Sequence, residues 1–193
     1  MTENLLRDKI NVWKSFPRNN MEELATADDY FDRELMPLSR DIFVEGQQGK
    51  AKNSYYGMML TLGTSWQPLA LSISLLKPQK LLIMCTQDTI GQLAKLKEFL
   101  QLEDATYTVN VVDRGSSEDI FKAMKAFYSK YGLGGRFCMD ITGGTKAMSS
   151  SAAIMAAVLG LDIYYVESKY LPLYRRPEPG SEELKALGNP QEN

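Results

Sequence analysis

The sequence contains no histidine. This absence removes the commonest general base of enzymes and excludes Ser-His and Cys-His catalytic pairs. Only two cysteines are present, Cys85 and Cys138, and neither has cysteine or histidine neighbours at the spacing of a metal site. Both lie in apolar, strand-like runs, so we expect reduced core residues and neither a bound metal nor a cofactor. Any chemistry must use lysine, serine, threonine, tyrosine, carboxylates or groups of the substrate.

Long apolar runs and an excess of positive charge are also missing. No run reaches the roughly 20 apolar residues that span a bilayer, and the first residues do not follow the pattern of a signal peptide. We therefore expect a cytoplasmic protein without membrane contact. The formal net charge of -2 argues against a basic surface that would bind long nucleic acids. With 193 residues, 44% of them hydrophobic, the chain is long enough for one well-formed core.

Strand-like and helical segments alternate from about Met58 onward, which is typical of a parallel sheet with crossover helices. Five strands are predicted, at residues 58–62, 80–85, 107–112, 136–141 and 162–166. These runs are apolar at successive positions, as strands covered on both faces require. Helices are predicted at residues 68–76, 116–131 and 147–159. The sequence therefore predicts an α/β fold, a Rossmann-like, doubly wound, mostly parallel sheet of five to six strands with helices on both faces.

The first 50 residues differ from the rest. Leu6, Ile10 and Trp13 indicate a short amphipathic helix, and residues 21–36 are acidic. We predict an N-terminal helical and acidic extension over residues 1–50 and a ligand-binding domain over residues 51–193. Residues 45–54 are predicted to be a surface connection. The tail after Tyr170 is rich in proline, glycine and glutamate, so we expect it to be irregular and exposed.

The loop Asp-Ile-Thr-Gly-Gly-Thr-Lys joins the fourth predicted strand to a helix rich in alanine and serine. Gly143 and Gly144 permit a tight turn and close approach to a ligand, and Thr142 and Thr145 add hydroxyl donors. Lys146 adds an ammonium charge where the start of a helix already attracts anions. The spacing fits neither a Walker A loop nor the dinucleotide-binding Gly-x-Gly-x-x-Gly. The loop favours a phosphorylated ligand, with an ordinary turn capped by Thr145 as the alternative.

A second turn of glycine and hydroxyl residues follows the first predicted strand. It consists of Gly63, Thr64, Ser65, Trp66 and Gln67. In a doubly wound sheet of order 3-2-1-4-5 this strand lies beside the fourth one, so both turns should face one crevice. Trp66 and Gln67 are candidates to stack on and hydrogen-bond a base, although packing of Trp66 against a helix is equally open. Thr86, after the second strand, adds a polar group at the same edge.

These residues resemble the CRISPR-associated Rossmann-fold (CARF) family, whose members sense cyclic oligoadenylate second messengers. The resemblance rests on residues 63–68, 140–148 and 173–182, and it covers roughly residues 58–190. It implies a homodimer in which one ring of four or six adenylates lies across the two-fold axis. It also implies that ring phosphates or riboses are held by Gly143, Gly144, Thr145 and Lys146, with Thr64, Ser65 and Trp66 beneath the ligand. Family members commonly carry a C-terminal effector, and we predict none within these 193 residues.

The resemblance implies a sensor of cyclic oligoadenylate, with cyclic tetra-adenylate favoured, in type III CRISPR antiviral defence. The same residues would also support slow, metal-independent ring cleavage, in which a 2′-OH of the ligand attacks the adjacent phosphate. Lys146 and Ser65 are the candidate catalytic residues, the first for charge stabilisation and the second for positioning. Two alternatives remain open, a Rossmann-like enzyme acting on a small phosphorylated metabolite and a dimeric interaction module without a ligand.

Overall fold

The computed structural model describes residues 2–50, 54–114, 116–189 and 191. The chain divides into two compact units. The first comprises Met1–Gln48 and Glu167–Glu183, and the second comprises Gly49–Val166 and Leu184–Asn193. The domain boundary that we placed near residue 50 stays a prediction.

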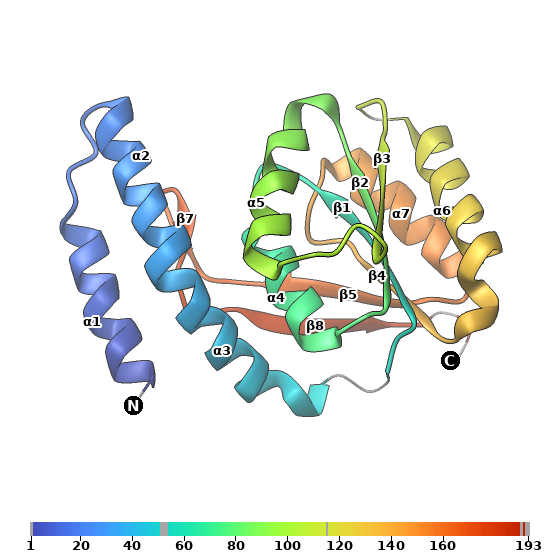
Figure 1. Ribbon diagram of the computed structural model, residues 1–193, viewed down its shortest axis with the longest axis horizontal. Helices are drawn as coiled ribbons and strands as arrows, with labels where there is room; N and C mark the ends of the chain where they lie inside the picture. Colours follow the sequence, from blue (N-terminus) through green and yellow to red (C-terminus); the bar gives the residue numbers. More distant parts are fainter. Residues whose placement is uncertain (1, 51–53, 115, 190, 192–193) are drawn as a thin grey trace. The chain divides into compact units, whose positions relative to one another are not determined.

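A six-stranded sheet of order β3-β2-β1-β4-β5-β8 forms the centre of the second unit (Figure 1). Its strands are β1 (Gly57–Leu62), β2 (Lys80–Cys85), β3 (Tyr107–Val111), β4 (Phe137–Asp140), β5 (Asp162–Glu167) and β8 (Glu183–Gly188). All neighbouring pairs from β3 to β5 are parallel. The predicted Rossmann-like sheet is therefore confirmed, and the strand order reverses between β1 and β4.

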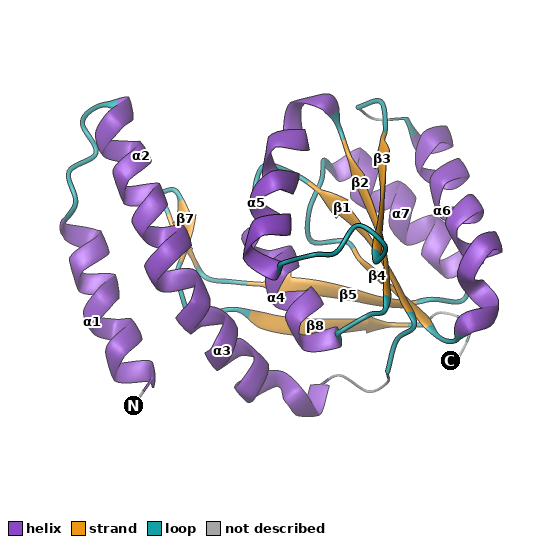
Figure 2. Cartoon of the chain, viewed as in Figure 1, coloured by secondary structure: helices purple, strands orange, loops and turns teal. Residues whose placement is uncertain are grey.

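Four helices cover this sheet. They are α4 (Gln67–Leu76), α5 (Ile90–Leu100), α6 (Ser117–Tyr131) and α7 (Lys146–Val158). The helices α4 and α5 lie together on one face, and α6 and α7 lie together on the other (Figure 2). Every residue of β1 and β4 is buried, because central parallel strands are covered on both faces. Cys85 and Cys138 are buried free thiols, as the sequence predicts.

The tail after Tyr170 is more ordered than we expected. The short strands β6 (Tyr170–Leu171) and β7 (Arg176–Pro177) form an antiparallel pair, and β8 completes the sheet. The expectation of an irregular tail was therefore wrong for these segments, since two-residue strands produce no alternating pattern. In the predicted connection at residues 45–54, the helix α3 (Met36–Gln47) continues into a 3-10 turn at Gln48–Lys50, and residues 51–53 lie outside the described residues.

The first unit contains the helices α1 (Thr2–Ser15), α2 (Met21–Tyr30) and α3, a π-helical turn at Phe31–Leu35 between α2 and α3, and the β6-β7 pair. Its centre is Trp13, whose ring lies 5.0 Å from that of Tyr174 and 5.3 Å from that of Phe31. The guanidinium of Arg176 pairs with Asp28 at 2.7 Å. Ring contacts and this ion pair thus join the N-terminal helices to a segment about 150 residues later in the chain.

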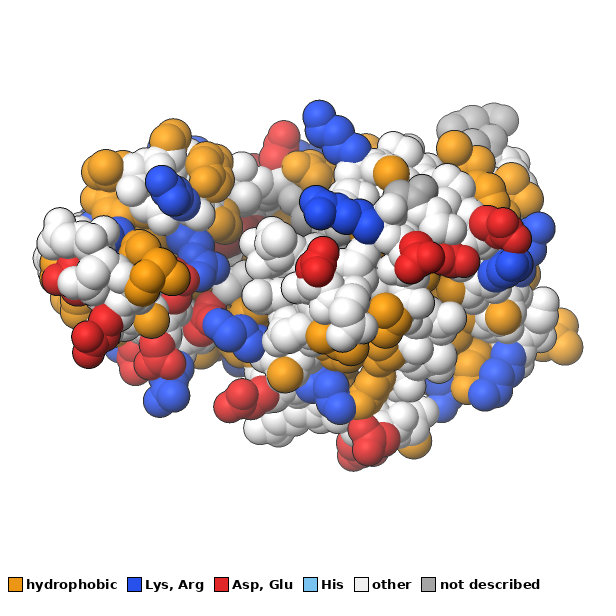
Figure 3. Space-filling view, turned by 90° about the horizontal axis from the view of Figure 1, so that it is seen from above, with side chains coloured by type: hydrophobic (Ala, Val, Ile, Leu, Met, Phe, Trp, Pro, Cys, Tyr) orange, Lys and Arg blue, Asp and Glu red, His pale blue; other side chains and the backbone are white. Residues whose placement is uncertain are grey.

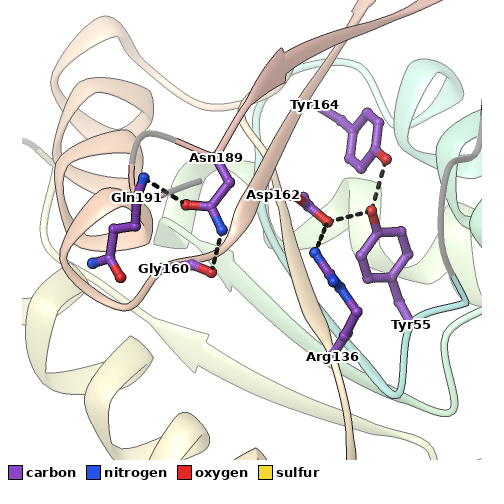
Figure 4. Close-up of polar contacts among 7 residues, drawn as sticks. All are labelled: Tyr55, Arg136, Gly160, Asp162, Tyr164, Asn189 and Gln191. Atoms are coloured by element: carbon purple, nitrogen blue, oxygen red, sulfur yellow. Dashed lines mark hydrogen bonds and ion pairs between the residues drawn. The ribbon is translucent and has the colours of Figure 1, made fainter. Parts of the chain in front are cut away.

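A buried hydrogen-bond network ties together the amino ends of β1, β4 and β5 (Figure 4). The hydroxyl of Tyr55 donates to Asp162 Oδ2 at 2.7 Å and lies 2.7 Å from the hydroxyl of Tyr164. Arg136 approaches the same carboxylate at 3.4 Å. Burial raises the pKa of both tyrosines, so their hydroxyls stay protonated and available as donors.

Removing the hydroxyl of Tyr55 should destabilise the protein. We expect Tyr55→Phe to lower the free energy of unfolding by about 1–3 kcal/mol, because it leaves the buried hydroxyl of Tyr164 and the carboxylate of Asp162 each one partner short. The matched control is Tyr107→Phe. The hydroxyl of Tyr107 bonds to Asp104 at the exposed surface, and its removal should change the free energy of unfolding by less than about 0.5 kcal/mol. Urea unfolding measures the free energy of unfolding of both variants. An equal decrease in Tyr55→Phe and Tyr107→Phe would contradict a special role for the buried network.

Glu182 in the first unit should make stability depend on pH. Its carboxylate accepts the N–H of Gly180 at 2.7 Å, and burial raises the pKa of Glu182 from 4.5 to about 7. The fold thus favours the neutral acid, so the stability from this group is complete below pH 4.5 and is lost as the pH rises through 7. We expect Glu182→Gln, which cannot ionise, to gain up to about 3 kcal/mol relative to the wild type between pH 5 and 8. Denaturant unfolding at several pH values measures the difference in free energy of unfolding between Glu182→Gln and the wild type. A difference that does not change with pH would contradict the ionisation of a buried Glu182.

Candidate functional site

A pocket of about 150 Å³ lies where β1 and β4 end and their loops begin. Its lining consists of Gly63, Thr64, Ser65, Pro68, Leu69, Thr142, Gly143 and Gly144. Six of these eight residues were predicted to bind a ligand, and they come from both predicted turns. The structure therefore brings the two turns together at the point where the strand order reverses, which is where doubly wound sheets bind ligands.

Glycine is required where the two loops meet. A Cβ atom on Gly143 would lie 2.1 Å from the carbonyl oxygen of Thr61, and one on Gly63 would lie 2.7 Å from the amide nitrogen of Gly144. Gly144 also has a φ of +81°, in the region that residues with a side chain rarely adopt. The two loops are thus in direct backbone contact, and a side chain at these positions would separate them.

Buried side chains hold the second loop from within. Asp140, the last residue of β4, is fully buried and accepts the N–H of Thr142 at 2.7 Å and the hydroxyl of Ser72 in α4. Burial raises the pKa of Asp140. The hydroxyl of Thr142 accepts the N–H of Val166 in β5 at 2.8 Å. The loop is therefore anchored to the strand before it, to the neighbouring strand and to a helix on the opposite face.

The start of α7 presents hydrogen-bond donors and positive charge. Thr145 caps the helix by accepting the N–H of Met148 at 3.2 Å. Within the described ranges, no hydrogen bond uses the amide N–H of Gly143, Gly144 or Thr145. Lys146 is exposed and makes no ion pair with a described residue. Free N–H groups, the helix dipole and an ammonium group together favour a bound anion such as a phosphate.

Five predicted ligand residues lie outside the pocket lining. Thr145 and Lys146 are at the start of α7, and the other three are Trp66, Gln67 and Thr86. Trp66 is only 2% exposed, and its ring lies 4.9 Å from that of Phe99, so it packs against a neighbouring aromatic ring, as the alternative interpretation held. Gln67 is buried. Thr86 is buried as well, and its hydroxyl lies 3.2 Å from that of Thr89 in a capping box. Their contacts with a ligand stay predictions.

Asp140 and Thr61 belong to the segments from which the site was predicted, but the sequence analysis assigned neither of them a role. Thr61 donates a hydrogen bond to the carbonyl oxygen of Gly143 at 2.7 Å although it is fully buried in β1. Each is a polar residue in an otherwise apolar strand, two or three positions before a glycine of the turn, and that position was the available signal. Among the described residues, no group of three or more cysteine or carboxylate side chains is arranged to hold a metal ion.

The charged side chains of one face of the molecule do not gather into a patch of a single sign. In the face drawn in Figure 3, basic and acidic side chains are interspersed. None of the described helices is both long and apolar enough to cross a membrane.

Comparison with known proteins gives one sequence relative and related folds, and no family model matches the chain. The CRISPR system endoribonuclease Csm6 of Thermus thermophilus is 30% identical over 140 residues. The matched region is 68% of this chain and 29% of that protein. The chain therefore spans less than a third of this relative.

The solved structures that share the fold include the following two, both at low sequence identity. One is Can2 from Sulfobacillus thermosulfidooxidans in complex with cyclic tetra-adenylate, with a TM-score of 0.53, 13% identity and coverage of 72% of this chain and 39% of that one. The other is Enterococcus italicus Csm6 bound to cyclic hexa-2′-fluoro-hexa-dAMP, with a TM-score of 0.51, 10% identity and coverage of 70% and 43%. At these identities the likeness establishes the fold.

Adding a methyl group to Gly143 should separate the two loops. Because the new Cβ would meet the carbonyl oxygen of Thr61 at 2.1 Å, we expect Gly143→Ala to lower the free energy of unfolding by more than about 2 kcal/mol. Gly91→Ala in α5 is the control, since a Cβ there meets nothing within 4 Å and should leave stability unchanged or raise it by up to about 1 kcal/mol. Denaturant unfolding of both variants makes the comparison, and a tolerated Gly143→Ala would refute the tight backbone contact.

Proposed function

Because this chain carries a CRISPR-associated Rossmann-fold (CARF) domain, we propose that it binds a cyclic oligoadenylate at the pocket between β1 and β4, with cyclic tetra-adenylate as the first candidate. The observation that carries the proposal is that the amide N–H groups of Gly143, Gly144 and Thr145, which directly precede Lys146, have no hydrogen-bond partner among the described residues. Phosphodiester linkages are anionic and rich in acceptors, so they match this set of donors. The hydroxyls of Thr64 and Ser65 supply further donors on the opposite wall.

The size of the pocket supports a ligand shared between two copies of the chain. At about 150 Å³ the pocket is smaller than the roughly 300–1,000 Å³ of most small-molecule sites. It can hold a phosphate and part of a ribose, whereas a ring of several nucleotides must extend beyond it. A two-fold dimer would offer the same donors to both halves of a symmetric ring. We propose a homodimer of this kind.

The exposed face of α7 supplies a candidate contact for the homodimer. Ala147, Ser150, Ile154 and Val158 recur at helical spacing and are all exposed, and the two larger side chains are 59% and 62% exposed. Small and apolar residues in a stripe allow two helices to pack closely. Because α7 begins directly after the pocket loop, a two-fold axis near its start would place two pockets side by side.

The biological role that we propose is that of a messenger sensor in type III CRISPR antiviral defence, acting in the cytoplasm of a prokaryotic cell. The relative from Thermus thermophilus is described as a CRISPR system endoribonuclease, and the chain covers 29% of it. The two solved structures that share the fold hold a cyclic adenylate or an analogue of one, so we propose that this chain binds such a signal, and we propose no endoribonuclease activity for it.

Slow cleavage of the ring is a second candidate function, favoured by the exposed Lys146 and Ser65 beside the pocket. A 2′-OH of the ligand would attack the adjacent phosphorus while the 5′-oxygen leaves, which produces a linear strand with a 2′,3′-cyclic phosphate. Lys146 would stabilise the negative charge that develops on the phosphate, and Ser65 would hold the reacting groups in line. Groups that bind the intact ring equally well add nothing to this rate, so only a measurement of products separates sensing from cleavage.

Binding can be tested with a mixture of cyclic tri-, tetra- and hexa-adenylate in EDTA, followed by mass spectrometry of the retained and the released species. We expect one ring per two chains. At about 100 times the dissociation constant, the ring should raise the free energy of unfolding by roughly 2.7 kcal/mol. Lys146→Ala should weaken binding about 10- to 100-fold by removing a charge-assisted contact. The control Lys125→Ala removes the same charge from an exposed position on α6 and should leave the affinity unchanged.

The alternatives predict different results in the same experiment. An enzyme of phosphorylated metabolites would bind one small ligand per chain and no ring. An interaction module would show dimerisation without stabilisation by any nucleotide. Equal affinities of the wild type and Lys146→Ala would overturn the site assignment, and linear products with a 2′,3′-cyclic phosphate end would establish ring cleavage.

A further inference from the structure

Two fully buried polar side chains, Thr61 and Asp140, adjoin the pocket without lining it. Thr61 lies next to the end of β1, and Asp140 is the last residue of β4. Burying a hydroxyl and a carboxyl is unfavourable unless both are hydrogen-bonded. Their partners are therefore informative, and in both cases they include a backbone group of the loop that contributes Thr142, Gly143 and Gly144 to the pocket.

Thr61 fixes one peptide group of this loop. Its hydroxyl donates to the carbonyl oxygen of Gly143 at 2.7 Å. A trans peptide is planar, with its C=O and N–H pointing in opposite directions. Holding the carbonyl of Gly143 on the side of β1 therefore also sets the direction of the N–H of Gly144. This N–H is one of those without a partner among the described residues.

Asp140 fixes a second peptide group and links it to the other wall of the pocket. Its Oδ1 accepts the N–H of Thr142 at 2.7 Å, which sets the direction of the peptide between residues 141 and 142. Its Oδ2 lies 2.5 Å from the hydroxyl oxygen of Ser72. Ser72 belongs to α4, and its hydroxyl oxygen also lies 3.1 Å from the carbonyl oxygen of Leu69, a residue of the pocket lining. One carboxyl thus contacts both the second loop and the helix that follows the first.

The contact between Asp140 and Ser72 can be satisfied by two arrangements of protons. With an ionised carboxyl, the single hydroxyl proton of Ser72 points to Oδ2. With a neutral carboxyl, Oδ2 donates to Ser72, and the hydroxyl of Ser72 donates to the carbonyl oxygen of Leu69. An asparagine amide at position 140 reproduces the second arrangement, since its N–H₂ donates to Ser72 while its oxygen accepts the N–H of Thr142. The geometry therefore requires hydrogen bonds at this position and does not require a charge.

We propose that Thr61 and Asp140 are positioning residues, which hold the peptide groups between residues 143 and 144 and between residues 141 and 142, so that this loop keeps its shape and the N–H of Gly144 stays directed at an anion in the pocket. For the identity of that anion the inference rests on the proposed function. The orientation of the loop does not depend on it, and it can be measured in the chain without a ligand.

The test uses pairs of variants that differ by one polar group. Thr61→Val removes the hydroxyl with little change of shape, and Thr61→Ser keeps it. Asp140→Ala removes both acceptors, and Asp140→Asn keeps the hydrogen bonds. Three quantities are measured for each variant, namely the NMR order parameters of the Gly143 and Gly144 amides without ligand, the affinity for cyclic tetra-adenylate, and the free energy of unfolding.

We expect Thr61→Val and Asp140→Ala to lower the two amide order parameters from about 0.85 toward 0.6 and to weaken ring binding by about tenfold or more. Thr61→Ser and Asp140→Asn should stay close to the wild type in both readouts. Should Asp140→Ala fail to fold, the nearly isosteric Thr61→Val still decides the question. A purely structural role would lower the free energy of unfolding while leaving the order parameters and the affinity unchanged.

The outcomes separate this inference from the proposed function. A rigid loop and full affinity in Thr61→Val would overturn the positioning role. Loss of loop order in Asp140→Asn equal to that in Asp140→Ala would overturn the role that we assign to hydrogen bonding. A wild-type chain that binds no ring, with order parameters that respond as expected, would refute the proposed ligand and support the positioning of the loop.

Discussion

The direct backbone contact between the two loops at the carboxyl ends of β1 and β4 is the constraint on which the rest of the site depends. Gly143 lies so close to the carbonyl oxygen of Thr61 that a Cβ would come within 2.1 Å of it. The contact closes one side of the pocket and leaves the amide groups at the start of α7 without partners among the described residues. The topology of a doubly wound sheet determines where the two loops meet. The glycines allow the loops to approach closely, so that backbone N–H donors line the pocket. The site is therefore made largely of backbone, and the anion binding that we propose for it needs no histidine side chain.

The fold and the position of the pocket could be predicted because both depend on local patterns. Fully apolar strands followed by glycine turns indicate a buried parallel sheet, and the strand order then brings the two turns together. The side chains within the turns were harder to place. Trp66 lies in a loop by sequence, yet it is buried against Phe99, which lies 33 positions later in the chain. The bond between Tyr55 and Asp162 spans 107 positions. Such contacts depend on how helices and strands pack on the sheet, and no local pattern carries that information. The strand β8 escaped prediction for the same reason, since only its place beside β5 makes it a strand.

At the carboxyl end of β4, an apolar residue would favour stability, whereas the hydrogen bonds that hold the pocket loop require a polar one. A carboxyl group in the position of Asp140 is costly to bury, as the raised pKa of Asp140 reflects. An apolar residue would pack there without that cost, but it would leave the N–H of Thr142 and the hydroxyl of Ser72 without this acceptor. The tyrosine network at the opposite end of the sheet differs, because the hydrogen bonds of Tyr55 to Asp162 and Tyr164 join strands to one another. Buried polar groups thus join the strands at the amino end of the sheet, and in our proposal they orient a loop at its carboxyl end.

The shape of the pocket limits which ligands a single chain can hold completely. Its walls are glycine backbone, small hydroxyls, a proline and a leucine, and its described lining contains no aromatic ring on which a base would stack. Recognition within one pocket must therefore act on the phosphate and sugar, which every nucleotide shares, and such contacts distinguish one nucleotide from another poorly. Selectivity for one messenger then has to arise from the spacing between successive phosphates. Spacing is measured only when two pockets bind the same molecule, so a dimer would determine which ring is accepted as well as how tightly it is bound. In the proposed dimer, the surface along α7 would therefore be as much a part of the recognition site as the loop at its start.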